Sequence, residues 1–99
     1  MNPKDWPFDQ APNVAAITST HITKDGDPIL LVTHYEDDHS WGFQSGKPIE
    51  TKDGQLVAMK SIVDLDPTVM QIADLPPGWS AERDAVDADW RKYKDDWEE

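Results

Sequence analysis

The segment from His34 to His39 gathers the side chains of this chain that are most able to do chemistry. It reads His-Tyr-Glu-Asp-Asp-His, so two imidazoles flank three carboxylates. Imidazole nitrogens and carboxylate oxygens are ligands that divalent metals use in proteins. The segment lacks the alternating ligands and the glycine of a calcium-binding loop. We therefore favour a polar, solvated loop joining two strands, and keep a small metal-dependent enzyme that uses His34 and His39 as an alternative.

No other pattern in the sequence marks a catalytic centre. The five glycines are isolated from one another, and neither Gly-x-Ser-x-Gly nor His-Glu-x-x-His occurs. The chain has no cysteine, which removes thiolate nucleophiles and thiolate metal sites. Carboxylates are plentiful, but none is paired in an apolar setting that would separate an acid from a base. The sequence thus predicts a protein without enzymatic activity, metal or cofactor.

An aromatic strand follows the acidic loop directly. Residues 40–45 read Ser-Trp-Gly-Phe-Gln-Ser, and the alternation of side chains along a strand puts Trp41 and Phe43 on one face. We favour a core position for both aromatic side chains. The alternative is an acidic, partly apolar patch that binds a protein, because aromatic side chains often anchor protein interfaces. The candidate contacts of such a patch are Glu36, Asp37, Asp38 and Trp41.

The charge balance restricts the kinds of partner. Twenty acidic and nine basic residues give a net charge of -11, so phosphate backbones repel the chain and nucleic-acid binding is not expected. The same charge can steer the chain toward a basic protein, although its simplest effect is solubility. The N-terminus lacks the apolar run of a signal peptide, and the longest apolar stretch, residues 29–32, is far too short to span a membrane. We expect a cytoplasmic protein that does not bind membranes.

Strand signals dominate the middle of the chain. Residues 14–22, 28–35, 40–45 and 55–60 are rich in β-branched or aromatic residues, and residues 79–84 form a last candidate strand. Asp25-Gly26 and Asp53-Gly54 are typical of two-residue hairpin turns, which need positive φ angles. The continuous apolar run in residues 28–35 indicates either a strand buried on both faces or a central place in the sheet.

One helix has clear boundary signals. Asp66 is a good N-cap, Pro67 suits the first helical position, and the prolines with Gly78 at residues 76–78 end the helix. Residues 61–64 are expected to form a short lead-in turn or helix. In the tail, Trp90, Tyr93 and Trp97 have the i, i+3 and i+4 spacing that would place them on one helical face. We expect that face to dock on the domain's own core. The alternatives are a surface for a partner or a second copy of the chain, and a disordered tail.

These signals predict a single domain in the α+β class. Residues 1–13 form an extended N-terminal arm, residues 14–84 the domain, and residues 85–99 an acidic tail or helix. The domain is expected to hold one antiparallel sheet of four to five strands, one central helix at about 66–75, and a C-terminal helix.

Residues 22–83 resemble small bacterial domains of the immunity protein 33 type, which are linked to polymorphic toxin systems. The resemblance rests on Gly26 before an apolar strand, on Ser40-Trp41-Gly42-Phe43-Gln44-Ser45-Gly46 after the acidic loop, on Asp66-Pro67, and on residues 75–78 and 81–83. It implies an immunity role, with a basic toxin or nuclease as the partner. The proline-containing arm and the tryptophan-containing tail lie outside the pattern.

Three functions therefore follow from the sequence. The first is a non-enzymatic, acidic protein-binding domain, most concretely an immunity-like inhibitor of a basic toxin. The second is a bacterial regulatory or housekeeping domain that acts as a homodimer. The third is the metal-dependent enzyme, which has the least support.

Overall fold

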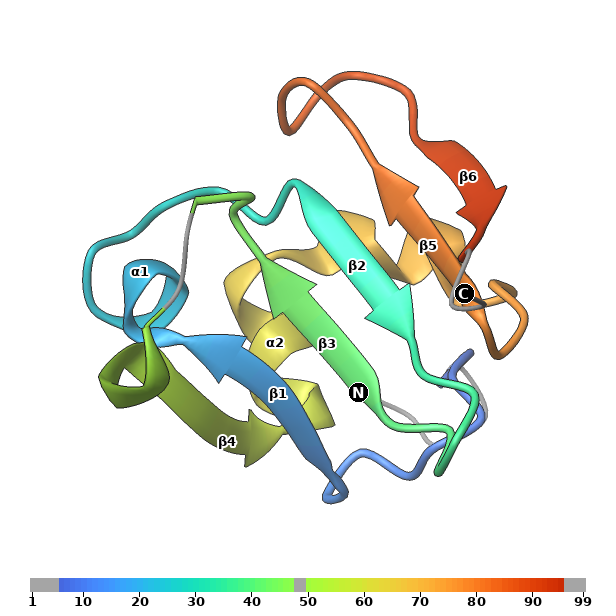
Figure 1. The fold of residues 1–99 in the computed structure, drawn as a ribbon, viewed down its shortest axis with the longest axis horizontal. Helices are drawn as coiled ribbons and strands as arrows, with labels where there is room; N and C mark the ends of the chain where they lie inside the picture. Colours follow the sequence, from blue (N-terminus) through green and yellow to red (C-terminus); the bar gives the residue numbers. More distant parts are fainter. Residues whose placement is uncertain (1–5, 48–49, 96–99) are drawn as a thin grey trace.

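A computed structural model describes residues 6–47 and 50–95 of the chain. Its centre is a six-stranded sheet with the strand order β4-β1-β3-β2-β5-β6 (Figure 1). The strands are β1 (Ala15–Ser19), β2 (Leu31–His34), β3 (Trp41–Gln44), β4 (Gly54–Ala58), β5 (Trp79–Glu82) and β6 (Arg91–Lys94). As expected, β2 takes a central place, between β3 and β5.

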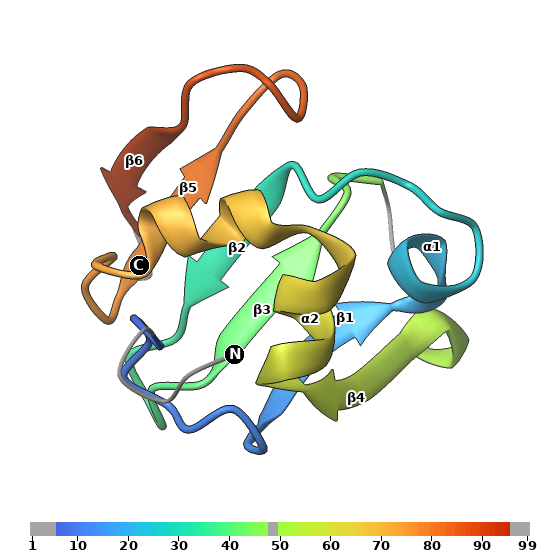
Figure 2. The ribbon, with the colours of Figure 1, turned by 180° about the vertical axis from the view of Figure 1, so that it is seen from behind.

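The helices are short and unevenly placed. They are α1 (Thr20–Thr23), the 3-10 turn η2 (Thr51–Asp53), α2 (Met59–Leu65) and the 3-10 helix η3 (Pro67–Ile72). α2 and η3 cross one face of the sheet, while α1 lies at one end (Figure 2). The opposite face carries no crossing helix among the described residues (Figure 1). None of the helices in residues 6–47 and 50–95 is long and apolar enough to cross a membrane.

The predicted antiparallel sheet of four to five strands is wrong, because the sheet has six strands and is mixed. β1 and β3 run parallel, with Ile17 opposite Gly42. Gly26 does have a positive φ of 77°, but it lies just beyond the end of α1, where amides of residues 24 and 25 bond to the carbonyl of Thr20. A glycine of this conformation suits both hairpin turns and helix ends. Because the chain turns into α1, β2 does not pair with β1.

The hairpin predicted at Asp53-Gly54 is also wrong. Residues 51–53 form η2, and β4 pairs antiparallel with β1, with Ile17 opposite Leu56. β1 is therefore enclosed by two strands that follow it at a distance in the sequence.

The predicted C-terminal helix is also wrong. Residues 91–94 form β6, which pairs with β5. Trp79 lies opposite Lys94 at one end of this pairing, and Glu82 lies opposite Arg91 at the other. Without β6, the outer edge of β5 would expose unpaired backbone groups, and pairing at that edge outweighs the local helical pattern. Trp90 stacks over the Arg83 guanidinium at 4.1 Å from the ring centroid, and Tyr93 lies on β6. Trp97 lies outside the described residues.

The single central helix at about 66–75 is replaced by two short helices. The Asp66 cap is confirmed, since its Oδ1 accepts the backbone N–H of Thr68 at 3.0 Å. The helix that follows Pro67 is a 3-10 helix, and α2 precedes it. Asp66 also ends α2, because its N–H donates to the carbonyl of Ile62. One residue thus separates two helices whose apolar faces both pack on the sheet.

The core lies between the sheet and these two helices. Trp41 and Phe43 are fully buried there, as favoured from the sequence, together with residues of α2 and η3. Phe8 of the N-terminal arm joins them, with its ring edge-on to Trp41 at 5.0 Å between centroids. Burial of these large rings stabilises a small core, because each aromatic side chain removes a large apolar area from water.

Candidate functional site

The acidic loop joins β2 to β3 at one end of the sheet. The N–H of Tyr35 donates to the carbonyl of Ser40 at 2.8 Å, which closes the loop, and the N–H of Ser40 donates to Asp38 Oδ1 at 3.1 Å. His39 adopts a positive φ of 60° at the turn, a conformation that few non-glycine residues take. Glu36, Asp37 and Asp38 are all exposed. The backbone thus holds three carboxylates together in solvent.

These three carboxylates have no cationic partner among the described residues. Ion pairs elsewhere occupy Lys47, Lys52, Arg83, Arg91 and Lys92. None of those pairs involves Glu36, Asp37 or Asp38. Hydrogen bonds from the Ser40 side chain and backbone also hold the pKa of Asp38 below its usual value, so this carboxylate stays ionised well below neutral pH.

Trp41 is not part of this exposed surface. Its side chain is fully buried, and its Nε1–H donates to Asp9 Oδ1 of the N-terminal arm at 2.9 Å. The ring also stacks on His34 at 4.0 Å between centroids. Trp41 therefore stabilises the fold and is not available to contact a partner, so the predicted patch loses its aromatic member.

The two histidines of the loop do not converge on a metal site. His34 is buried, and its Nδ1–H donates to the carbonyl of Leu75 at 2.7 Å. Its Nε2 lies 3.2 Å from Asp9 Oδ2, so both ring nitrogens face protein oxygens. His39 is exposed on the turn. Across residues 6–47 and 50–95, no group of three or more histidines and carboxylates is arranged to hold a metal ion.

Tyr35 supplies an aromatic side chain next to the loop instead. Its ring lies over Gly42 on the open face of the sheet: a Cβ at Gly42 would come within 3.1 Å of the ring. Burial raises the pKa of the Tyr35 hydroxyl, and the negative charges of Asp95 and Asp38 raise it further. Tyr35 is therefore a neutral, half-buried phenol in an acidic setting.

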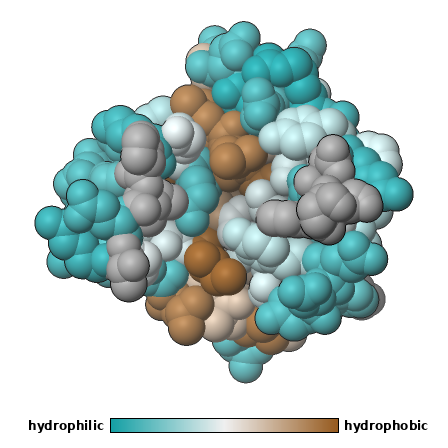
Figure 3. Space-filling model, in the orientation of Figure 1, coloured by the Kyte–Doolittle hydropathy of each residue, from teal (hydrophilic) through white to brown (hydrophobic). Residues whose placement is uncertain are grey.

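A mixed row of aliphatic and hydroxyl-bearing side chains crosses the open face beside Tyr35. The registers of the sheet align Leu56, Ile17, Gly42, Thr33, Ser80 and Tyr93 in one row across the six strands. Figure 3 shows apolar surface running between hydrophilic flanks on this side of the molecule. Asp95 sits beside the row and accepts the Ser80 hydroxyl at 2.6 Å. The loop thus borders a surface that combines carboxylates, hydroxyls and apolar groups.

Sequence reasoning found the acidic loop but missed Tyr35, Asp9 and Asp95. Tyr35 could have been placed from strand alternation, because residues 31, 33 and 35 point away from Val32 and His34. Nothing in the local sequence marks Asp9 or Asp95, since each meets its partner through pairing of distant segments.

Comparison with protein-family models, with curated proteins and with solved structures finds no match to this chain. The resemblance to immunity protein 33 domains therefore stays a prediction from the motifs of residues 22–83.

Proposed function

We propose that this chain is a non-enzymatic protein-binding domain that recognises a basic protein. The observation that supports the proposal is the loop at residues 36–38, whose three exposed carboxylates have no cation partner within the described residues. An immunity-like inhibitor that covers the site of a basic toxin or nuclease is the most concrete form of this function. The absence of cysteine fits action in the cytoplasm.

Electrostatics suits such a function. The net charge of -11 raises the rate at which the domain meets a basic partner, and complementary charges also suppress binding to acidic proteins. The loop supplies a local concentration of that charge on a backbone closed by the Tyr35–Ser40 hydrogen bond. A rigid loop loses little conformational entropy on binding, which favours affinity.

Tyr35 takes the role that the sequence assigned to Trp41. It is half-buried beside the loop, so its ring is held in place and part of it still faces solvent. Tyrosine is enriched among the residues that contribute most to protein interfaces. The proposed contact surface is therefore Tyr35, Glu36, Asp37 and Asp38.

Affinity capture with matched baits tests the proposal. The full chain, a Glu36→Lys/Asp37→Lys/Asp38→Lys variant and a control reversing three exposed carboxylates elsewhere, Glu50, Asp74 and Asp89, are used on lysate of the native host. We expect a basic protein that the wild type and the control retain and the loop variant loses. Calorimetry with that purified protein should give at least a tenfold weaker Kd for the loop variant. Equal binding of all three baits to every captured protein would reject the loop as the site.

Self-association is the second candidate, favoured by one observation. β4 is an edge strand, and Leu56 on it is 70% exposed. Exposed edge strands with apolar side chains tend to pair with other chains. Sedimentation of the purified protein over a wide concentration range distinguishes this function, and a strict monomer excludes it.

A further inference from the structure

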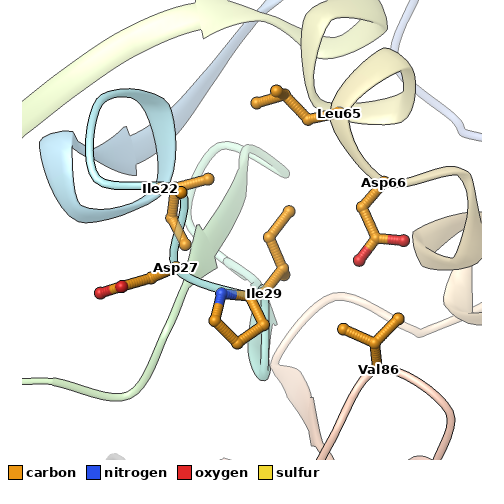
Figure 4. A pocket seen from close by; sticks show the side chains of 8 residues that line it. Ile22, Asp27, Ile29, Leu65, Asp66 and Val86 are labelled. Atoms are coloured by element: carbon orange, nitrogen blue, oxygen red, sulfur yellow. The ribbon is translucent and has the colours of Figure 1, made fainter.

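A pocket of about 300 Å³ lies at the other end of β2 from the acidic loop (Figure 4). The segment before β2, the turn after α2 and the segment after β5 surround it. Its lining consists of Ile22, Gly26, Asp27, Pro28, Ile29, Leu65, Asp66 and Val86. The volume is at the lower end of the roughly 300–1,000 Å³ range of ligand pockets, so it suits one side chain better than a large cofactor.

The walls of the pocket are mainly aliphatic. Ile22 and Ile29 are buried at its base, whereas Leu65 and Val86 are 56% and 44% exposed at its sides. Only four large hydrophobic side chains of the described residues are exposed, and two of them, Leu65 and Val86, flank this pocket. Exposed apolar groups gathered around a hollow are typical of a binding site rather than of ordinary surface.

Asp66 gives the pocket one fixed polar group. Its carboxylate points into the space between Leu65, Ile29 and Val86 (Figure 4), whereas the carboxylate of Asp27 points away. Oδ1 of Asp66 accepts the N–H and hydroxyl of Thr68, and Oδ2 accepts Arg83 Nη2 at 2.7 Å. A carboxylate has about four acceptor positions. One position of Asp66 Oδ2 therefore remains for a ligand.

Arg83 keeps that carboxylate in place. Its guanidinium is fully buried and donates to the carbonyls of Ile29 and Val86 as well as to Asp66. The three segments that line the pocket are thus joined by one side chain. A pocket held in this way is largely formed before a ligand arrives, which reduces the entropy lost on binding.

The rim of the pocket is acidic. Asp25, Asp64 and Asp87 are exposed, and each is the chain neighbour of a lining residue. None of them has an ion-pair partner among the described residues. The cations beside the pocket are Arg83, which pairs with Asp66, Lys47, which pairs with Asp27 at 2.8 Å, and the exposed Lys24. Negative charge around an apolar hollow favours a ligand that is aliphatic along its length and cationic at its end.

We propose that this pocket binds an alkyl cation, namely the side chain of a lysine or arginine presented by another protein. The aliphatic stem packs on Ile22, Ile29, Leu65 and Val86, and the cationic head donates to Asp66 Oδ2 among the rim carboxylates. The choice of a protein as the source of this side chain rests on the proposed function, because a basic partner supplies many such groups. The affinity of the pocket for the alkyl cation itself is independent of that function.

Titration of the ¹⁵N-labelled full chain with n-butylguanidinium chloride, followed by amide chemical shifts, tests the pocket. We expect saturable shifts at Gly26, Ile29, Leu65 and Val86. The neutral isostere n-butylurea should bind about tenfold more weakly, because it loses a charge-assisted hydrogen bond. Guanidinium chloride, which lacks the stem, should give no saturation in the same range. Absent saturation with n-butylguanidinium, or equal binding of n-butylurea, overturns the proposal.

Two variants separate the pocket from general surface effects. Leu65→Lys places a tethered cation at the pocket, and we expect binding of n-butylguanidinium to fall at least tenfold. Leu56→Lys adds the same charge to a more exposed leucine on β4 and should leave the affinity unchanged. Neither change removes a buried group, so both variants should fold. Equal affinities for wild type and Leu65→Lys would contradict the assignment.

The two proposals can fail separately. If n-butylguanidinium does not bind but capture of a basic protein depends on residues 36–38, the pocket is rejected and the proposed function stands. If n-butylguanidinium binds but no protein is captured, the pocket stands and the proposed function is rejected.

Discussion

Replacing Arg83 with methionine should remove the contact that joins η3, β5 and the segment before β2. The guanidinium is fully buried and lies 2.7 Å from Asp66, whose side chain is itself only 13% exposed. It also donates to the carbonyls of Ile29 and Val86 and stacks under Trp90. Methionine fills much of the same volume but satisfies none of these acceptors, so the Asp66 carboxylate loses its cation.

The size of the loss follows from this burial. Removing one partner of a buried ion pair costs about 3–5 kcal/mol, because the remaining charge is desolvated without compensation. Domains of this kind unfold with a free energy of about 5–15 kcal/mol, so the change removes a large share of the total. With a urea m value of about 1–3 kcal/mol/M, the unfolding midpoint should fall by at least about 1 M.

Urea unfolding followed by circular dichroism measures this effect. Arg91→Met is the matched control: Arg91 also contacts two carboxylates, Glu82 and Asp84, but it is 53% exposed. Exposed pairs contribute about 0–1 kcal/mol, so the control should stay close to wild type. The double variant Arg83→Met/Asp66→Asn should be more stable than Arg83→Met alone, since it removes the unpaired charge. A loss below about 1 kcal/mol for Arg83→Met, or no recovery in the double variant, would contradict the stabilising role of the buried Arg83–Asp66 pair.

Three further predictions concern the sheet. Gly42→Ala should lower the free energy of unfolding by about 1 kcal/mol, because its methyl group would press on the Tyr35 ring. In a double-mutant cycle, the same substitution in a Tyr35→Ala background should leave the free energy of unfolding unchanged. Trp41→Phe should lower the free energy of unfolding, measured by thermal unfolding, by about 1–2 kcal/mol, since it deletes the hydrogen bond to Asp9 and part of the stacking on His34. Unchanged stability would contradict the role of Trp41 in the core. The raised pKa of Tyr35 means that its contribution to stability is complete below its ordinary pKa of 10.0 and is lost as pH rises through the folded-state pKa. Wild type should therefore lose more stability than Tyr35→Phe between pH 9 and 11 in urea unfolding, and parallel losses would refute this.

Local signals predicted the parts of the fold that depend on neighbouring residues. Asp66 and Pro67 begin a helix because the cap bond spans only two residues. The alternation of Trp41 and Phe43 placed both side chains in the core. The acidic loop was also correctly located between two strands. Each of these features follows from chemistry within a few positions of the chain.

The parts that failed depend on distant pairing. Gly26 has the conformation that its motif requires, yet it follows a helix rather than forming a hairpin turn. The tail has helical aromatic spacing, yet residues 91–94 complete the edge of β5. The burial of Trp41 beside Asp9 requires the N-terminal arm to fold over the sheet. None of these outcomes has a local signature, so the candidate site could be predicted only as a loop and not as a surface.

The parallel pairing of β1 with β3 also sets the order in which the chain can fold. Both strands that pair with β1 follow it in the sequence, and β4, the later of the two, ends only at Ala58. The hairpin of β2 and β3, closed by the loop at residues 35–40, is by contrast local and can form early. Long-range pairing slows folding, so docking of β1 between β3 and β4 should follow this hairpin. The same three carboxylates that we assign to partner binding therefore sit at the turn of an early hairpin. Substitutions that relieve their mutual repulsion should accelerate folding, whereas charge changes at the rim of the pocket should leave the folding rate unchanged.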